Sequence, residues 1–190
     1  MTLMPQRWTT FFAAAVLVVA TAGVGTAQQE SIEELRERAE QGDADVQYNL
    51  GVMYDNGEGV PQDAAEAVRW YRLAADQGEP RAQHNLGVRY ANGRGVPQDD
   101  VEAVRLFRLA ADQGHANGQN NLGRMYRSGL GVPQDDVEAY KWFNLAASRS
   151  TGTTRENAVE ARDQAASRLT PDQRAEAQRL AREWDEAHPR

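Results

Sequence analysis

One eight-residue phrase occurs three times in this 190-residue chain, at a constant interval of 36 residues. It reads NGEGVPQD at Asn56–Asp63, NGRGVPQD at Asn92–Asp99 and SGLGVPQD at Ser128–Asp135. The surrounding sequence keeps the same register, because three units align without gaps: Asp43–Gly78, Glu79–Gly114 and His115–Ser150. A fixed period of this length is typical of repeat proteins, in which each unit is a small structural element that stacks on its neighbours.

Each unit has the apolar pattern of two helices. The first is predicted at about Ala44–Asn56, where apolar residues recur at helical spacing and form one stripe. Its members are Val46, Leu50, Met53 and Tyr54. The second is predicted at about Ala64–Gln77, with one apolar side made of Ala67, Trp70, Tyr71, Ala74 and Ala75. The pattern therefore predicts an all-α fold built from helix-turn-helix units.

The repeated phrase is interpreted as the connection between the two helices of a unit. Its glycines suit turn conformations that a residue with a Cβ resists, and its proline ends the helix before it. Asp63 with Glu66 has the pattern of a helix-capping box, repeated at Asp99/Glu102 and Asp135/Glu138. A Gly-x-Gly phosphate loop is the alternative. Such a loop follows a strand, which is absent here, and the aspartate at the helix start is itself negative.

Three glycines fall inside the predicted first helices, at Gly51, Gly87 and Gly123. Glycine in a helix costs about 1 kcal/mol relative to alanine, so a cost repeated three times indicates that two helices approach closely there. The large residues expected to face these glycines come from the second helices: Trp70 and Tyr71, Leu106 and Phe107, and Trp142 and Phe143.

The segments that flank the three units are predicted to cap the array. Ser31–Gly42 aligns with the second helix of a unit and is interpreted as an N-terminal half-repeat. Thr153 and Glu156 are expected to cap one further helix, and TPDQ at Thr170–Gln173 to start a last one. The C-terminal capping helices would span 153–187, so that the array has nine helices and looks complete. Apolar residues expected to pack on the third unit are Leu169, Leu180, Ala181 and Trp184.

The unit resembles the Sel-one-like repeat, a relative of the tetratricopeptide repeat. The resemblance is carried by A-x-x-x-L-G-x-x-Y, G-x-G-V-P-x-D and A-x-x-W-[YF]-x-x-A-A, and it covers Asp43–Ser150. It implies a right-handed α-solenoid and a scaffold or adaptor for other proteins. Some secreted relatives bind or hydrolyse β-lactams, but those have paired cysteines in each unit and this chain has no cysteine. A cysteine-free relative of these proteins is therefore the alternative function.

The first 27 residues have the pattern of a secretory signal. They carry one charge, Arg7, followed by the apolar run Phe11–Ala20 and then by small residues. Cleavage is predicted after Ala27, with Ala22 as the alternative, and an uncleaved membrane anchor is the competing interpretation. We expect the mature protein to be periplasmic or secreted, without membrane insertion after cleavage. A net charge of −7 argues against a nucleic-acid partner, because phosphate backbones repel an acidic surface.

Residues that could carry chemistry are sparse. The chain has three histidines and no cysteine, and none of the histidines has the spacing of a metal pair. Serine never occurs in G-x-S-x-G, and the paired carboxylates occupy cap positions where the helix dipole favours them. We therefore predict no catalytic residues, no metal and no cofactor, and we expect His84 to be an exposed helix residue.

One stripe of each first helix changes from unit to unit. Its positions are spaced i, i+4 and i+7 and so share one face, distinct from the face of Leu50 and Tyr54. The stripe reads Tyr48, Val52 and Asp55, then His84, Val88 and Ala91, then Asn120, Arg124 and Arg127, and all of these except Ala91 are predicted to bind a partner. In tetratricopeptide-like arrays the first helices line the concave side, so the resemblance implies that this stripe faces a protein or peptide partner. The alternatives are exposed positions under no constraint, and a purely structural part of an envelope complex.

Overall fold

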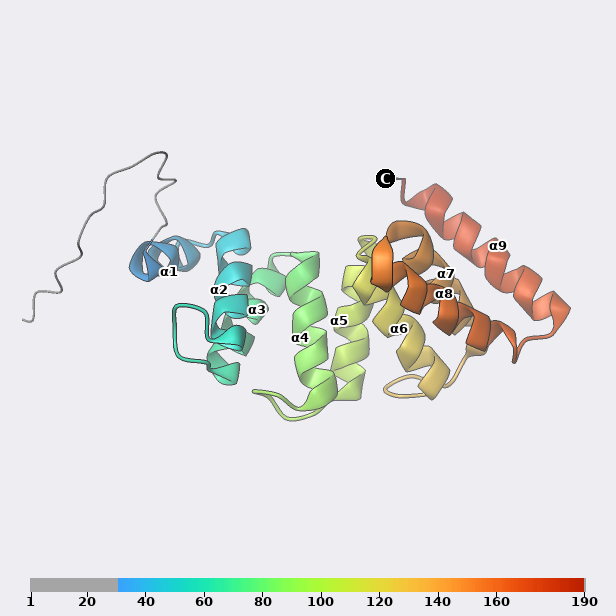
Figure 1. Cartoon of the computed structure of the whole chain (residues 1–190), viewed down its shortest axis with the longest axis horizontal. Coiled ribbons are helices and arrows are strands. Elements are labelled where there is room, and N and C mark those ends of the chain that lie inside the picture. Colours follow the sequence, from blue (N-terminus) through green and yellow to red (C-terminus); the bar gives the residue numbers. More distant parts are fainter. Residues whose placement is uncertain (1–30, 190) are drawn as a thin grey trace, which may run out of the picture.

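The computed structural model describes residues 31–189 and is entirely helical over that range. In chain order its helices are α1 (Ile32–Glu40), α2 (Ala44–Asn56), α3 (Ala64–Asp76), α4 (Pro80–Asn92), α5 (Asp100–Asp112), α6 (Ala116–Ser128), α7 (Asp136–Arg149), α8 (Gly152–Ala166) and α9 (Pro171–Ala187). They follow one another along the long axis of the molecule (Figure 1). The all-α prediction is confirmed, and the helix bounds agree with the sequence pattern to within a residue or two. The predicted signal at 1–27 lies outside the described residues.

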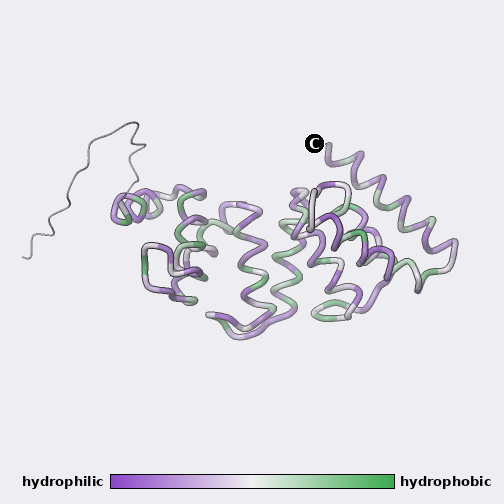
Figure 2. Tube along the Cα trace, viewed as in Figure 1, coloured by the Kyte–Doolittle hydropathy of each residue, from purple (hydrophilic) through white to green (hydrophobic). Residues whose placement is uncertain are grey.

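The helices pair as antiparallel hairpins that stack into an α-solenoid. In each unit the first helix packs on the second, and each second helix also packs on the first helix of the next unit. Tyr90 and Tyr126 each contact the apolar clusters of two successive units, so the core continues along the array. Apolar and polar residues are interspersed along every helix, as burial of one side requires (Figure 2). Within residues 31–189, no helix combines the length and apolar character needed to span a bilayer.

Successive units are also joined by a repeated arginine–tyrosine hydrogen bond. Arg72 on α3 donates to the Tyr90 hydroxyl on α4 at 2.9 Å, and Arg108 on α5 donates to the Tyr126 hydroxyl on α6 at 2.6 Å. The second helices therefore use an arginine that the sequence pattern alone places on a solvated face.

The second helices begin at aspartate caps, but the predicted capping box is only half formed. The Asp63 carboxylate accepts from the N–H groups of Ala65 and Glu66. The other half is wrong, because Glu66 receives a hydrogen bond from Arg69 at 2.9 Å instead of from the Asp63 N–H. That N–H donates to the Tyr54 carbonyl at 2.9 Å. The same backbone bond recurs from Asp99 to Tyr90 and from Asp135 to Tyr126, and it ties each second helix to the end of the first.

The glycines inside the first helices mark the predicted close approach. A Cβ added at Gly51 would lie 2.5 Å from the Tyr71 ring, and one at Gly87 would lie 2.7 Å from the Phe107 ring. The facing residue is the second member of each predicted pair of large residues: Tyr71, Phe107 and Phe143.

A Gly87→Ala variant is expected to be less stable than the wild type, although alanine in a helix normally gains about 1 kcal/mol over glycine. The new methyl group would displace the Phe107 ring, and such overpacking typically costs about 1–3 kcal/mol. Urea denaturation measures the change. The loss should shrink when Phe107→Leu is combined with it, and a Gly87→Ala midpoint above that of the wild type would contradict the close approach.

The two ends of the array differ in how well the sequence predicts them. At the N-terminal end, α1 buries Ala39 against the first unit, as the half-repeat interpretation expects, and it also has a complete capping box between Ser31 and Glu34 that was not predicted. At the other end, the predicted cap at Thr153 and Glu156 is wrong. Helix α8 begins at Gly152, and its N-cap residue Thr151 makes no side-chain cap bond. Gly152 has a φ of 55° and makes the turn after α7, so Thr153 already lies inside the first helical turn.

Helix α9 packs on α7 and makes little contact with α8, unlike the second helix of a repeat. The Trp184 ring meets Trp142 edge-on at 5.9 Å between centroids, and Asp185 pairs with Arg149 at 2.7 Å. The predicted packing against the third unit is therefore confirmed for Leu169, Ala181 and Trp184. A consequence is that Leu145 of α7 is only 1% exposed, whereas its counterparts Leu73 and Leu109 are each 39% exposed.

Candidate partner-binding surface

The surface formed by α2, α4 and α6, called here the first-helix face, carries all eight residues predicted to bind a partner. They are Tyr48, Val52 and Asp55 on α2, His84 and Val88 on α4, and Asn120, Arg124 and Arg127 on α6. Only Arg124 is exposed, and the other seven are half-buried. Several of them lie where the first helix of one unit meets the first helix of the next, a contact called here a seam. At the seams they have intramolecular partners.

Between α2 and α4, the predicted residues are held by side chains of the next unit. Asp55 forms an ion pair with Arg89, and both side chains are largely buried, with 15% and 9% exposed. The Tyr48 ring lies under the Arg81 guanidinium, 4.4 Å from the ring centroid. Sequence reasoning missed Arg89, although a signal existed. Arg89 stands in an apolar stripe at the position where the other units have methionine, and a charge in such a stripe calls for a buried partner.

The seams further along are held by hydrogen bonds and not by ion pairs. His84 Nε2 accepts from the Asn121 side-chain amide at 3.0 Å, and His84 Nδ1 donates to Asn85 Oδ1 at 3.1 Å. At the next seam, Arg127 donates to Gln164 of α8 at 2.9 Å. His84 is therefore a contact between units, contrary to the expectation that it is an exposed helix residue.

Burial changes the protonation of the histidine at this seam. It lowers the pKa of His84 to about 4, and the nearby His115 lowers it further. The two rings lie 5.1 Å apart between centroids, and burial also lowers the pKa of His115. His84 is consequently neutral in the folded protein at physiological pH.

Acidification is expected to destabilise the protein through His84. The unfolded chain binds the proton near pH 6.5 and the folded chain only near pH 4, so protons favour unfolding in this window. The effect grows as the pH falls from 6.5 to 4 and reaches at most about 3 kcal/mol. Urea denaturation at several pH values should show a smaller loss for His84→Asn, which places there the residue type of Asn120. Carboxylates titrate equally in both proteins, so identical pH profiles would contradict this role.

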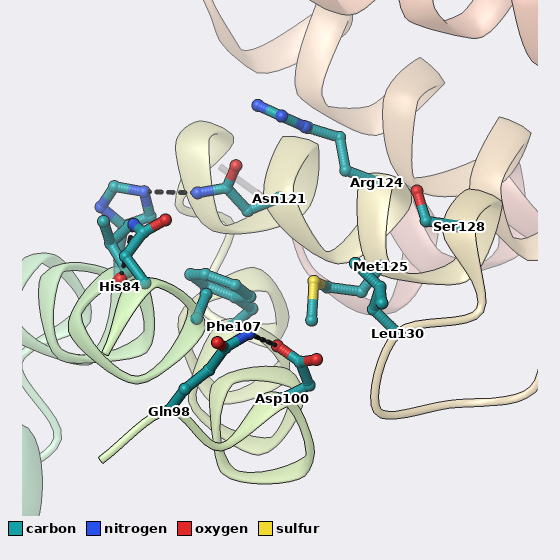
Figure 3. A pocket seen from close by; sticks show the side chains of 12 residues that line it. His84, Gln98, Asp100, Phe107, Asn121, Arg124, Met125, Ser128 and Leu130 are labelled. Atoms are coloured by element: carbon teal, nitrogen blue, oxygen red, sulfur yellow. Dashed lines mark hydrogen bonds between the residues drawn. The ribbon is translucent and has the colours of Figure 1, made fainter. Parts of the chain in front are cut away.

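A pocket of about 490 Å³ opens on the first-helix face between the second and third units (Figure 3). It lies between α4 and α6, with α5 beneath. Its lining residues are His84, Val88, Ala91, Asn92, Gln98, Asp100, Phe107, Asn121, Arg124, Met125, Ser128 and Leu130. The structure thus brings together three of the predicted residues, His84, Val88 and Arg124, and adds apolar ones that sequence reasoning did not select.

The pocket has an apolar base and a polar rim. Phe107 and Met125 face each other at the base, and Leu130 of the α6–α7 connection lies beside them with 48% of its surface exposed (Figure 3). At the rim, Asp100 accepts a long hydrogen bond of 3.4 Å from Gln98. Arg124 makes no ion pair or hydrogen bond within residues 31–189 and leaves its guanidinium open to a ligand. This arrangement can bind, because an apolar hollow with a few polar groups is the usual form of a ligand site.

The pocket exists because two positions change between seams. The residues Asp55 and Arg89, which pair between the first and second units, correspond to Ala91 and Met125 between the second and third. Alanine and methionine fill less space than the ion pair and carry no charge. The seam between the second and third units is therefore open and apolar where its counterpart is closed and charged.

Metal-ligating side chains are dispersed over the described residues 31–189. In the part of the chain that the structure describes, no three His, Asp or Glu side chains are placed to hold a metal ion. Asp99 and Asp135 are engaged as helix caps.

Comparisons with known proteins agree with the architecture. The Sel1 repeat family model matches residues 44–79, 80–115 and 116–150. The crystal structure of a Sel1 repeat protein from Oxalobacter formigenes is 38% identical, with a TM-score of 0.60, and the match covers 68% of this chain and 97% of that one. No curated protein matches the sequence.

Two further solved structures are similar. One is c5321, a protective antigen present in uropathogenic Escherichia coli strains displaying an SLR fold. It is 33% identical with a TM-score of 0.61, and the match covers 81% of this chain but only 40% of that one. The other is Helicobacter pylori cysteine rich protein B, 20% identical with a TM-score of 0.51 over 70% of this chain and 97% of that one, which shows the fold alone. The β-lactam alternative gains no support from it. Given three matched units that together cover more than half of the sequence, this chain belongs to the Sel1 repeat family.

Proposed function

We propose that this protein is an exported scaffold or adaptor of the cell envelope, whose first-helix face binds a partner protein or peptide. Sel1 repeat proteins are generally protein-interaction scaffolds and are typically not enzymes. We choose this face because it has a pocket of about 490 Å³ between α4 and α6, with the unpartnered Arg124 at its rim. Intramolecular contacts fill most of the other predicted positions, so the pocket is where this face has room for a partner.

The test of this face is site-specific photo-cross-linking in envelope extract. A photo-reactive residue replaces Ser128, which is exposed at the pocket edge, in one variant and Leu109 in a matched control, because Leu109 is exposed on the second-helix side. We expect discrete adducts of defined mass from position 128 and none from position 109. Equal labelling from both positions, or no adduct from position 128, would count against the proposed face.

Export is supported by the charge and hydropathy pattern of the first 27 residues. Cell fractionation followed by sequencing of the mature N-terminus tests it. The expected product is periplasmic or secreted and begins at Gln28, after Ala27. A cytosolic product that retains Met1 would refute export without bearing on the binding face.

A further inference from the structure

We propose that the pocket between the second and third units is an anchor site for a partner peptide. In this proposal, which rests on the proposed function, the pocket receives one bulky apolar side chain and Arg124 holds an acidic side chain next to it. The occupant is thus an extended segment with a leucine- or phenylalanine-like residue close to an aspartate or glutamate.

The base of the pocket selects the apolar side chain. Val88, Phe107 and Met125 present carbon and sulfur surface toward the hollow, and about 490 Å³ is ample for a single large side chain. Leu130 supports the same conclusion. It is 48% exposed at the pocket edge, whereas the other two units have a glutamate and an arginine at this position, Glu58 and Arg94. An apolar residue at this one connection gives a peptide side chain further apolar surface to cover.

The acidic side chain is selected by charge. Arg124 is exposed and makes no hydrogen bond or ion pair within residues 31–189, and the corresponding residues of the other units are the valines Val52 and Val88. A guanidinium can bind a carboxylate through two parallel hydrogen bonds, which gives direction as well as affinity. The net charge of the protein is −7, so attraction of an acidic side chain requires a local cation such as Arg124.

The direction of the peptide follows from a second hollow on the other side of Arg124. This hollow has a volume of about 230 Å³ and lies between α6 and α8, lined in part by Asn120, Arg127 and Glu160. Arg124 lines both this hollow and the apolar pocket, so the two are continuous across its side chain. A segment anchored in the apolar pocket therefore continues across Arg124 toward α8, with its acidic residue on the α8 side of the anchor.

The seam between the first and second units does not offer this site. Asp55 and Arg89 meet there, and the charges neutralise each other. The double substitution Ala91→Asp/Met125→Arg should therefore close the pocket, because it introduces at this seam the pair that the same fold accommodates one unit earlier.

The experiment uses short synthetic peptides on a Gly/Ser/Thr/Asn background. One position carries Leu, Phe, Ser or Lys, and a position a few residues before or after it carries Glu, Gln or Lys. Binding to the purified protein is measured by fluorescence anisotropy. We expect the Leu–Glu and Phe–Glu peptides to bind, and replacement of either residue by its polar or neutral counterpart to weaken binding about tenfold or more. A set in which no peptide binds selectively would overturn the anchor proposal.

Three variants make the test specific. Ala91→Asp/Met125→Arg should abolish peptide binding while circular dichroism and the urea midpoint stay close to wild type. Arg124→Glu should reverse the preference, so that Leu–Lys binds better than Leu–Glu. Arg94→Glu, the matched change at the other seam, should leave binding unchanged. Retained binding in the double variant, or an unchanged charge preference in Arg124→Glu, would overturn the proposal.

The outcome separates the anchor from the proposed function. A partner that still cross-links to position 128 in the Ala91→Asp/Met125→Arg variant would show that the face binds without this anchor. Failure of both the cross-linking and the peptide binding would refute the two proposals together.

Discussion

An Asp55→Ala variant is expected to lose about 3–5 kcal/mol of unfolding free energy, because removal of one member of a buried ion pair leaves the other charge uncompensated. Arg89 is 8% exposed, and its Nε and Nη1 atoms have no other hydrogen-bond partner. The guanidinium would thus remain buried at the seam between the first two units with nothing to balance it. Urea denaturation followed by circular dichroism measures the loss.

The matched control combines Asp55→Ala with Arg89→Met. This double variant reproduces Ala91 and Met125 of the following seam, and replacement of a buried ion pair by apolar residues is often neutral or stabilising by about 1–4 kcal/mol. Its stability should return to that of the wild type or exceed it. A mild effect of Asp55→Ala, or a double variant as unstable as the single one, would mean that the pair is solvated and does not close the seam.

A Trp142→Ala variant is expected to lose a similar amount, about 3–5 kcal/mol, by creating a cavity in the core. Trp142 is 4% exposed, its Nε1 donates to Glu138 at 2.9 Å, and its ring meets Trp184 of α9. The loss should therefore include loosening of α9, seen as faster hydrogen exchange at 171–187 than in the wild type.

Trp142→Leu is the matched control for this change, because Leu106 occupies the corresponding position of the second unit and is 2% exposed. Leucine fills part of the space, so less than half of the destabilisation should remain. If alanine and leucine variants are equally unstable, shape complementarity with Trp184 matters more than buried volume. If exchange in α9 is unchanged in Trp142→Ala, α9 is not held by this contact.

Much of the fold could be predicted from the sequence because its signals are local. The helix starts follow from aspartate caps and the helix ends from glycines, and both act within a few residues of the chain. The close approach at Gly51 was also predictable, since a helical glycine repeated in every unit has a cost that only packing explains. The same pattern occurs in three units, so each cap, glycine and apolar position could be checked against two other copies.

The seams and the pocket could not be predicted in the same way. Helical periodicity identifies the face on which a residue lies but not the neighbour that it meets, so Asp55 was interpreted as exposed to a partner although it pairs with Arg89. The pocket depends on residues about one unit apart, such as Ala91 and Met125, whose combination matters more than either alone. The packing of α9 on the third unit was expected, but its small contact with α8 was not, because an apolar pattern does not say which of two neighbouring helices it meets.

Methyl NMR of the purified protein during titration with the Leu–Glu peptide tests the central claim, partner binding on the first-helix face, most directly. The account predicts shifts at the methyl groups of Val88, Met125 and Leu130, with Leu73 and Leu109 on the second-helix side unchanged. Shifts confined to Leu73 and Leu109, or no shifts at a saturating peptide concentration, would contradict it.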